Sequence, residues 1–165
     1  MLKSIVCCVA MLLVAIAAAR AEPVASGSDF HDIIPPDWRL VRSPHGSNEE
    51  GFASPRGDAW IVFKAKPASR SVAAQLALLR SVRGGAITYE RAGRTWIVVS
   101  GYKGNRIFYR KAMLACGGSA WHYLEFEYPG AEKRAFDKFV TRSSAALAAY
   151  SHSGCHRPQQ SEAAR

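Results

Sequence analysis

Apolar and polar residues alternate in short runs between residues 86 and 128, and turn residues separate these runs. The four runs are Ala86–Arg91, Arg94–Tyr102, Arg106–Cys116 and Ala120–Tyr128. Val, Ile, Thr, Tyr, Phe and Trp dominate them, which is typical of strands. Each separating segment contains Gly, and one adds Asn, residues that accept the positive φ of a tight turn. The pattern therefore predicts an antiparallel meander of four strands.

Upstream of the meander, the pattern predicts three shorter strands and a helix. Residues 38–42 alternate as a first strand, and Gly51 to Lys66 form a hairpin around the turn sequence Pro55-Arg56-Gly57-Asp58. The run Ser69-Arg70-Ser71 offers an N-cap, and Gly84-Gly85 ends the helix that follows it. The helical spacing is carried by Val72, Leu76, Leu79 and Val82.

A second helix is expected after Pro129-Gly130, which breaks the last strand. Its apolar stripe consists of Phe136, Phe139, Val140, Leu147 and Tyr150. In the last strand both the odd-numbered and the even-numbered side chains are partly apolar, so each face of the sheet should be covered. The order βββαββββα predicts an α+β fold: an antiparallel sheet of six or seven strands with two helices packed on it.

The first 21 residues have the features of a secretory signal. Lys3 precedes the apolar run Ile5–Ala18, and Ala19-Arg20-Ala21 places small residues at a cleavage site. A transmembrane anchor is the alternative, but the run is shorter than the roughly 20 apolar residues that cross a bilayer. We expect a periplasmic or secreted protein with a signal at 1–21, an extended arm at 22–37, one domain at 38–150 and a tail at 151–165.

The composition is typical of a globular domain, and the cysteines suggest one disulfide bond. Of 165 residues, 48% are hydrophobic and 21% are charged. Removing residues 1–21 leaves 20 basic residues against 13 acidic ones, and only Cys116 and Cys155 among the cysteines. In an exported chain two cysteines usually pair. Their bridge would close a loop of about 40 residues, worth roughly 4 kcal/mol in the chain-entropy model, and would fix the tail.

Several segments resemble the PsbP-like fold of extrinsic photosystem proteins and exported bacterial proteins. They are Pro36-Asp37-Trp38, the turn Phe52–Gly57, the helix before the meander and the helix after Tyr128-Pro129. Phe52–Gly57, Thr95–Gly101 and Tyr128-Pro129 are also similar to small uncharacterised exported proteins of proteobacteria. The resemblance covers Trp38 to about Tyr150 and implies an α/β/α sandwich with a non-catalytic accessory or binding role. No metal-binding or docking motif of PsbP matches residue by residue, so no site is carried over.

Two clusters could carry chemistry, and each has a structural alternative. Cys116 with His122 could form a thiol nucleophile and its base, but a predicted turn separates them and no orienting acid is identifiable. His152, Cys155 and His156 could bind a soft metal, but the thiolate is lost if the disulfide forms. The sequence therefore favours a protein that is not an enzyme and has no cofactor.

Basic and aromatic side chains gather in the meander. The candidate binding patch consists of Arg91, Arg94, Trp96, Lys103, Arg106, Tyr109, Arg110 and Lys111. Such a mixture can bind single-stranded nucleic acid, but export makes that partner improbable. An acidic protein or an anionic envelope polymer fits better. The alternative is a solvated basic face that serves only solubility.

Overall fold

The computed structural model describes residues 34–42 and 50–153, which contain seven strands and two α-helices. The expected signal, most of the expected arm and most of the expected tail lie outside these residues. The elements are β1 (Arg39–Arg42), β2 (Glu50–Ala53), β3 (Trp60–Pro67), α1 (Val72–Arg80), β4 (Gly85–Ala92), β5 (Trp96–Lys103), β6 (Arg106–Ala115), β7 (Ala120–Pro129) and α2 (Lys133–Ser153). Two 3-10 turns, η2 (Cys116–Gly118) and η3 (Gly130–Glu132), flank β7. The predicted order of three strands, a helix, four strands and a helix is confirmed.

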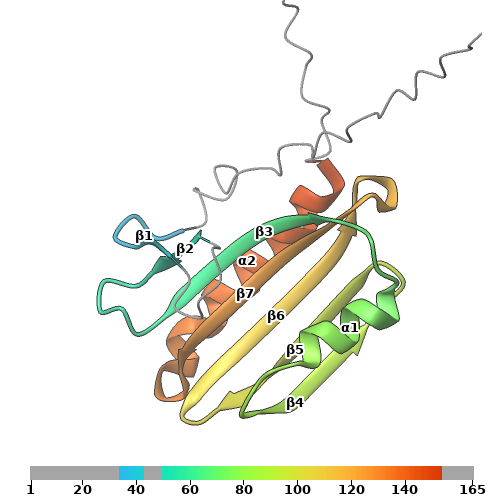
Figure 1. The fold of residues 1–165 in the computed structure, drawn as a ribbon. Helices are drawn as coiled ribbons and strands as arrows, with labels where there is room; N and C mark the ends of the chain where they lie inside the picture. Colours follow the sequence, from blue (N-terminus) through green and yellow to red (C-terminus); the bar gives the residue numbers. More distant parts are fainter. Residues whose placement is uncertain (1–33, 43–49, 154–165) are drawn as a thin grey trace, which may run out of the picture.

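The strands form one antiparallel sheet in the order β1-β2-β3-β7-β6-β5-β4 (Figure 1). The predicted meander supplies one side of the sheet and the predicted hairpin supplies the other. They join where β3 pairs with β7, from Trp60 opposite Glu127 to Pro67 opposite Ala120. As a result β7, the last strand in the chain, lies at the centre of the sheet.

The two helices pack on opposite faces of the sheet, as Figure 1 shows. On the α2 face, Phe139, Val140 and Leu147 join a core with Ile61, Leu124 and other sheet residues. On the α1 face, Leu79 packs in a second core with Ile97, Val99, Phe108 and Trp121. Neighbouring residues of a strand point to opposite faces, so β7 contributes Trp121 and Tyr123 to one core and Leu124 and Phe126 to the other.

Neither helix covers its whole face. The nine residues of α1 pack mainly against β5, whereas the 21 residues of α2 pack against β7 and β6. The α1 face is therefore left open over β3 and β7. The α2 face is open over β4 and β5, where Tyr89, Trp96 and Tyr102 are exposed. A ligand could therefore reach the sheet over β3 and β7 on the α1 face, and over β4 and β5 on the α2 face.

The core extends into the stretch that the sequence assigned to an arm. Ile34 is buried on the α2 face. The ring of Trp38 lies edge-on to that of Phe139, with 5.4 Å between the centroids. These contacts draw residues 34–38 against α2. The seven-stranded sheet and its two helices establish the α+β class for the described residues. The more specific similarity to the PsbP-like fold stays a prediction.

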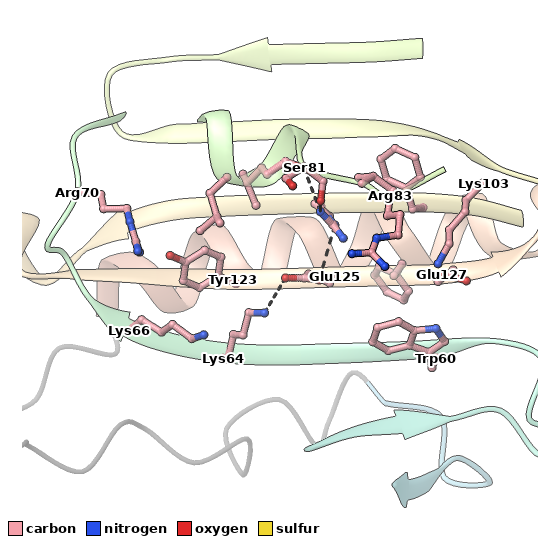
Figure 2. A pocket seen from close by; sticks show the side chains of 16 residues that line it. Trp60, Lys64, Lys66, Arg70, Ser81, Arg83, Lys103, Tyr123, Glu125 and Glu127 are labelled. Carbon is pink, nitrogen blue, oxygen red and sulfur yellow. Dashed lines mark hydrogen bonds and ion pairs between the residues drawn. The ribbon is translucent and has the colours of Figure 1, made fainter. Parts of the chain in front are cut away.

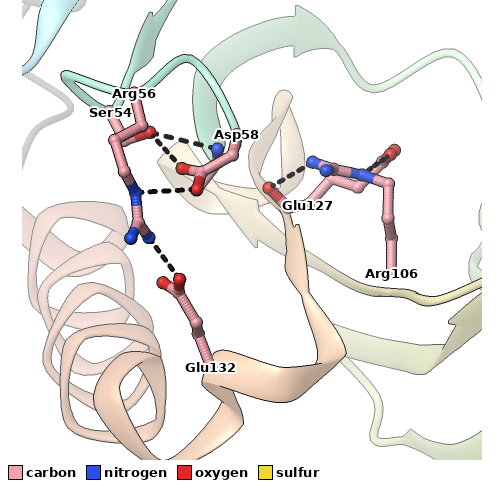
Figure 3. Close-up of polar contacts among 7 residues, drawn as sticks. Ser54, Arg56, Asp58, Arg106, Glu127 and Glu132 are labelled. Carbon is pink, nitrogen blue, oxygen red and sulfur yellow. Dashed lines mark hydrogen bonds and ion pairs between the residues drawn. The ribbon is translucent and has the colours of Figure 1, made fainter.

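An ion-pair network closes the end of the sheet next to α2 (Figure 3). Arg56, in the β2–β3 turn, pairs with Asp58 at 2.8 Å and also with Glu132 of η3. Ser54 Oγ donates a hydrogen bond of 2.8 Å to Asp58 and accepts one of 3.1 Å from the Ala59 amide. Glu132 therefore links the hairpin to the start of α2.

Candidate functional site

A groove of about 770 Å³ lies on the α1 face, above the sheet that α1 leaves open. β3 contributes Trp60, Lys64 and Lys66, which share a face because they are two or four residues apart. β7 contributes Tyr123, Glu125 and Glu127, and the end of α1 with the segment after it forms the opposite wall. Figure 2 shows these side chains facing one another across β7.

Positive charge dominates the groove. Two carboxylates, Glu125 and Glu127, lie at its floor. The cations are Lys64, Lys66, Arg70, Arg83, Lys103 and Arg110. Six cations against two anions in a concave site concentrate a positive potential there.

Glu125 organises the middle of the floor. Its Oε1 lies 2.7 Å from Lys64 Nζ, and its Oε2 lies 3.7 Å from Arg110 Nε. Arg110 also donates hydrogen bonds of 3.1 and 3.3 Å to the carbonyl oxygens of Leu79 and Ser81, at the C-terminal end of α1. A cation at this end of a helix satisfies carbonyls without intrahelical partners and complements the helix dipole. Arg110 therefore fixes α1 relative to the floor.

The second carboxylate, Glu127, is held by an arginine from the neighbouring strand. Arg106 Nε lies 2.6 Å from Glu127 Oε1, as Figure 3 shows. A second nitrogen of Arg106 donates a 3.3 Å hydrogen bond to the carbonyl oxygen of Glu127. Only 10% of the Glu127 side chain is exposed. Both floor carboxylates are thus oriented by basic partners on adjacent strands.

Three rim cations differ from the floor cations. Arg70 precedes α1, Arg83 follows it, and Lys103 ends β5; Figure 2 shows all three around the groove. Within residues 34–42 and 50–153, none of the three has a carboxylate within 4.0 Å. Their charge is available to an anion that enters the groove.

Tyr123 supplies an aromatic surface and a buried polar link. Lys64 Nζ lies 5.5 Å from the centroid of its ring. The phenol donates a 3.0 Å hydrogen bond to Gln75 Oε1, and burial raises the pKa of Tyr123. The Gln75 side chain is fully buried, and its Nε2 has no hydrogen-bond partner in the part of the chain that is described. The phenol stays neutral near pH 7 and fixes α1 over β7.

The structure divides the predicted basic-aromatic patch between the two faces of the sheet. Lys103 and Arg110 line the groove, and Arg106 borders it through Glu127. Strand alternation places Arg91, Trp96, Tyr109 and Lys111 on the α2 face, and Arg94 lies in the β4–β5 turn. The eight residues therefore do not form one continuous surface.

Two members of that patch are committed to packing against α2. Lys111 Nζ donates hydrogen bonds of 2.8 and 2.9 Å to the carbonyl oxygen and Oγ of Ser144. Tyr109 donates a 3.0 Å hydrogen bond to the same Oγ. Burial lowers the pKa of Lys111 and raises that of Tyr109. This pair ties β6 to α2.

Sequence reasoning missed four groove cations: Lys64, Lys66, Arg70 and Arg83. The parity of Lys64 and Lys66 on β3 was visible in the sequence. The pairing of β3 with β7, which places these lysines beside Glu125 and Tyr123, was not.

The residues proposed for thiol or metal chemistry are only partly described. His122 is buried on the α2 face, and its Nδ1 lies 3.2 Å from Ser151 Oγ. Cys116 begins η2 with φ of 54°. Cys155 and His156 lie outside the described residues, as does any contact they make, so the disulfide and the metal site stay predictions. Among described residues, no three His, Cys, Asp or Glu side chains group as metal ligands.

Comparison with known proteins adds little to this geometry. No protein-family model matches the chain, and no curated protein matches it. One similar solved structure is that of LpqN, involved in cell envelope biogenesis of Mycobacterium tuberculosis, with 16% identity over 66% of this chain and 75% of LpqN and a TM-score of 0.46. That similarity is too low for a conclusion about function. In the described ranges, every helix is too short or too polar to cross a bilayer.

Proposed function

We propose that this protein is an exported, non-enzymatic binding protein that holds an anionic ligand in the groove on the α1 face. One observation carries the proposal: Arg70, Arg83 and Lys103 surround a groove of about 770 Å³ with no carboxylate partner in the described chain. The expected signal at 1–21 supports export. The ligand would then be an acidic protein or an anionic polymer of the envelope.

The floor of the groove supports binding rather than catalysis. Glu125 and Glu127 are engaged by Lys64, Arg110 and Arg106, so the ionisable groups of the floor orient one another. Three rim cations above an ordered floor would attract an anion over a distance and then contact it directly. Attraction of this kind weakens as salt screens the charges.

The test compares two triple variants that lose the same charge. Arg70→Gln, Arg83→Gln and Lys103→Gln remove the rim cations. Arg91→Gln, Arg94→Gln and Arg142→Gln remove three exposed cations outside the groove. The affinity of each purified variant for dextran sulfate is measured over a range of salt concentrations.

We expect the groove variant to lose at least about tenfold in affinity, since each cation near an anionic surface contributes about 1 kcal/mol. The control should change little. An equal loss in both variants would contradict the proposal, because binding would then follow net charge. A loss confined to the control would instead support the patch that includes Arg91 and Arg94.

A further inference from the structure

The length of the groove indicates the shape of its ligand. Trp60 and Lys66 are six residues apart on β3, which corresponds to roughly 20 Å along a strand. Arg70 lies at the Lys66 end, because its carbonyl oxygen accepts a 3.4 Å hydrogen bond from Trp121, the residue opposite Lys66. Arg83 and Lys103 lie toward the Trp60 end, as Figure 2 shows. Cations without a carboxylate partner among residues 34–42 and 50–153 therefore occur at both ends of an elongated site.

A single compact anion could not reach both ends. An extended ligand with several anionic groups could contact Arg70 at one end and Lys103 at the other, with Lys64 and Arg110 between them. The distribution of charge along the groove thus fits a linear polyanion.

The two carboxylates at the floor of the groove indicate which functional groups the ligand should carry besides its anionic groups. Glu125 and Glu127 accept hydrogen bonds but donate none when ionised. A polyphosphate or polysulfate also only accepts hydrogen bonds, so it could pair with the rim cations but would be repelled by both carboxylates, which lowers its affinity. A ligand that alternates anionic groups with hydroxyl donors could contact the rim cations and also donate to Glu125 and Glu127. Carboxylate-bearing sugars have this composition.

The main chain under the groove argues against a peptide ligand. Extended peptides usually gain affinity by adding a strand to an exposed sheet edge. The floor strand β7 is paired on both sides, with β3 and with β6, so its backbone groups are used inside the sheet. Recognition must come from side chains on the face of the sheet, which suits a polyhydroxylated ligand.

We propose that the groove binds a linear polysaccharide containing uronic acid residues, several sugars long. This inference rests on the proposed anion-binding function and specifies its ligand class. The carboxylates of the sugars pair with Arg70, Arg83 and Lys103, while hydroxyl groups of the sugars donate hydrogen bonds to the carboxylate of Glu125, whose oxygens can each accept more than one.

The experiment is isothermal titration of the full chain with defined probes. The positive probe is a hexamer of galacturonic acid, compared with its dimer and with the fully methyl-esterified hexamer. An inorganic polyphosphate and hexaglutamate represent the other polyanions. We expect the hexamer to bind at least about tenfold more tightly than the dimer, the polyphosphate and hexaglutamate. The esterified hexamer, which lacks charge, should not bind measurably.

Glu125→Gln tests the role of the floor. Removing this charge should strengthen polyphosphate binding more than hexamer binding, because only the hexamer also loses hydrogen bonds to a charged acceptor. The ratio of the hexamer affinity to the polyphosphate affinity should therefore fall at least about threefold. Circular dichroism and thermal unfolding confirm that the variant is folded. A ratio that stays constant would contradict the role assigned to Glu125.

The outcomes separate the two proposals. If all polyanions bind equally and the rim triple variant abolishes binding, anion binding in the groove stands and the uronic acid inference falls. Tighter binding of polyphosphate or hexaglutamate than of the hexamer would also overturn the inference alone. If no polyanion binds, or the loss follows the control triple variant, both proposals fall.

Discussion

His122 shows how one buried side chain can make the stability of the fold depend on pH. It lies between the sheet and α2, with Nδ1 3.2 Å from Ser151 Oγ and its ring centroid 5.0 Å from that of Tyr150. Burial lowers its pKa from the ordinary 6.5. The unfolded chain therefore binds a proton on this ring more readily than the folded chain does.

The pH dependence of unfolding should reveal this residue. Because the pKa of His122 is depressed in the folded state, its contribution to stability is fully present above about pH 6.5 and is lost as pH falls through the folded-state pKa. We expect the free energy of unfolding in urea to decline from about pH 7 to pH 5, and His122→Gln to flatten that decline. A variant that keeps the slope of the parent chain would assign the effect to another group.

Gly101 marks a position where β5 cannot carry a side chain. A Cβ atom there would lie 1.9 Å from the carbonyl oxygen of Ala86 in β4, so the strands would have to separate. We expect Gly101→Ala to cost about 1–3 kcal/mol, the usual range for overpacking. Urea denaturation measures the loss, and an unchanged midpoint would show that β4 moves aside without cost.

Among the elements, α1 has the clearest local support in the sequence. Ser71 caps it, because the side chain accepts a 3.2 Å hydrogen bond from the Ala74 amide. Such caps contribute about 1 kcal/mol. α1 also separates the two rim arginines, Arg70 before it and Arg83 after it, so its stability bears on the groove.

Replacing the cap should weaken both the helix and the groove. We expect Ser71→Ala to lower the free energy of unfolding by about 1 kcal/mol. Ser69→Ala, an exposed serine two residues earlier, is the matched control and should have little effect. Unfolding in urea followed by circular dichroism compares the two. Equal losses would mean that the hydrogen bond to Ala74 adds nothing specific.

The sequence predicted these elements well because their signals are local. The meander was set by alternation and by turn glycines such as Gly104, whose φ is 60°. The stripe on α2 was set by helical spacing, and Phe139 and Leu147 are buried as expected. The β3–β7 pairing was not predicted, because residues 60–67 and 120–129 are far apart in sequence and alternation alone does not select a partner.

The same limit explains the candidate site. The sequence supplied Lys103 and Arg110, which belong to the meander, but it grouped them with Tyr109 and Lys111 on the opposite face. Alternation within the predicted strand 106–116 already places Arg110 on the face opposite Tyr109 and Lys111. The β5–β6 register, which places Lys103 on the same face as Arg110, was not available from the sequence. Lys64 lies in the groove because β3 pairs with β7, and Arg70 lies there because of where α1 packs on the sheet. Both depend on contacts between residues far apart in sequence, which alternation along one strand does not reveal.

At the scale of the whole molecule, one sheet serves two cores. Leu147 of α2 is fully buried in one, and Leu79 of α1 is 3% exposed in the other. β6 and β7 contribute side chains to both, so neither core can be lost while the sheet between them stays intact. We therefore expect the described domain to unfold as one unit.

Two core substitutions test this coupling. Leu147→Ala and Leu79→Ala should each cost about 2–5 kcal/mol, whereas Leu40→Ala, at a side chain 60% exposed, should cost far less. Tryptophan fluorescence reports on both faces, through Trp38 beside α2 and Trp121 beside α1. Far-UV circular dichroism reports on the helices and the sheet.

In every variant the two signals should change at the same denaturant concentration, because unfolding without a populated intermediate makes all probes coincide. If Leu79→Ala shifted only part of the signal, α1 would unfold before the rest. One wall of the groove would then belong to a helix that unfolds separately. The affinity for an anion would fall at a lower denaturant concentration than the one that unfolds the sheet. Coincident transitions would instead make the rigid sheet, with α1 fixed on it through Arg110 and Tyr123, the frame that holds the rim cations in place.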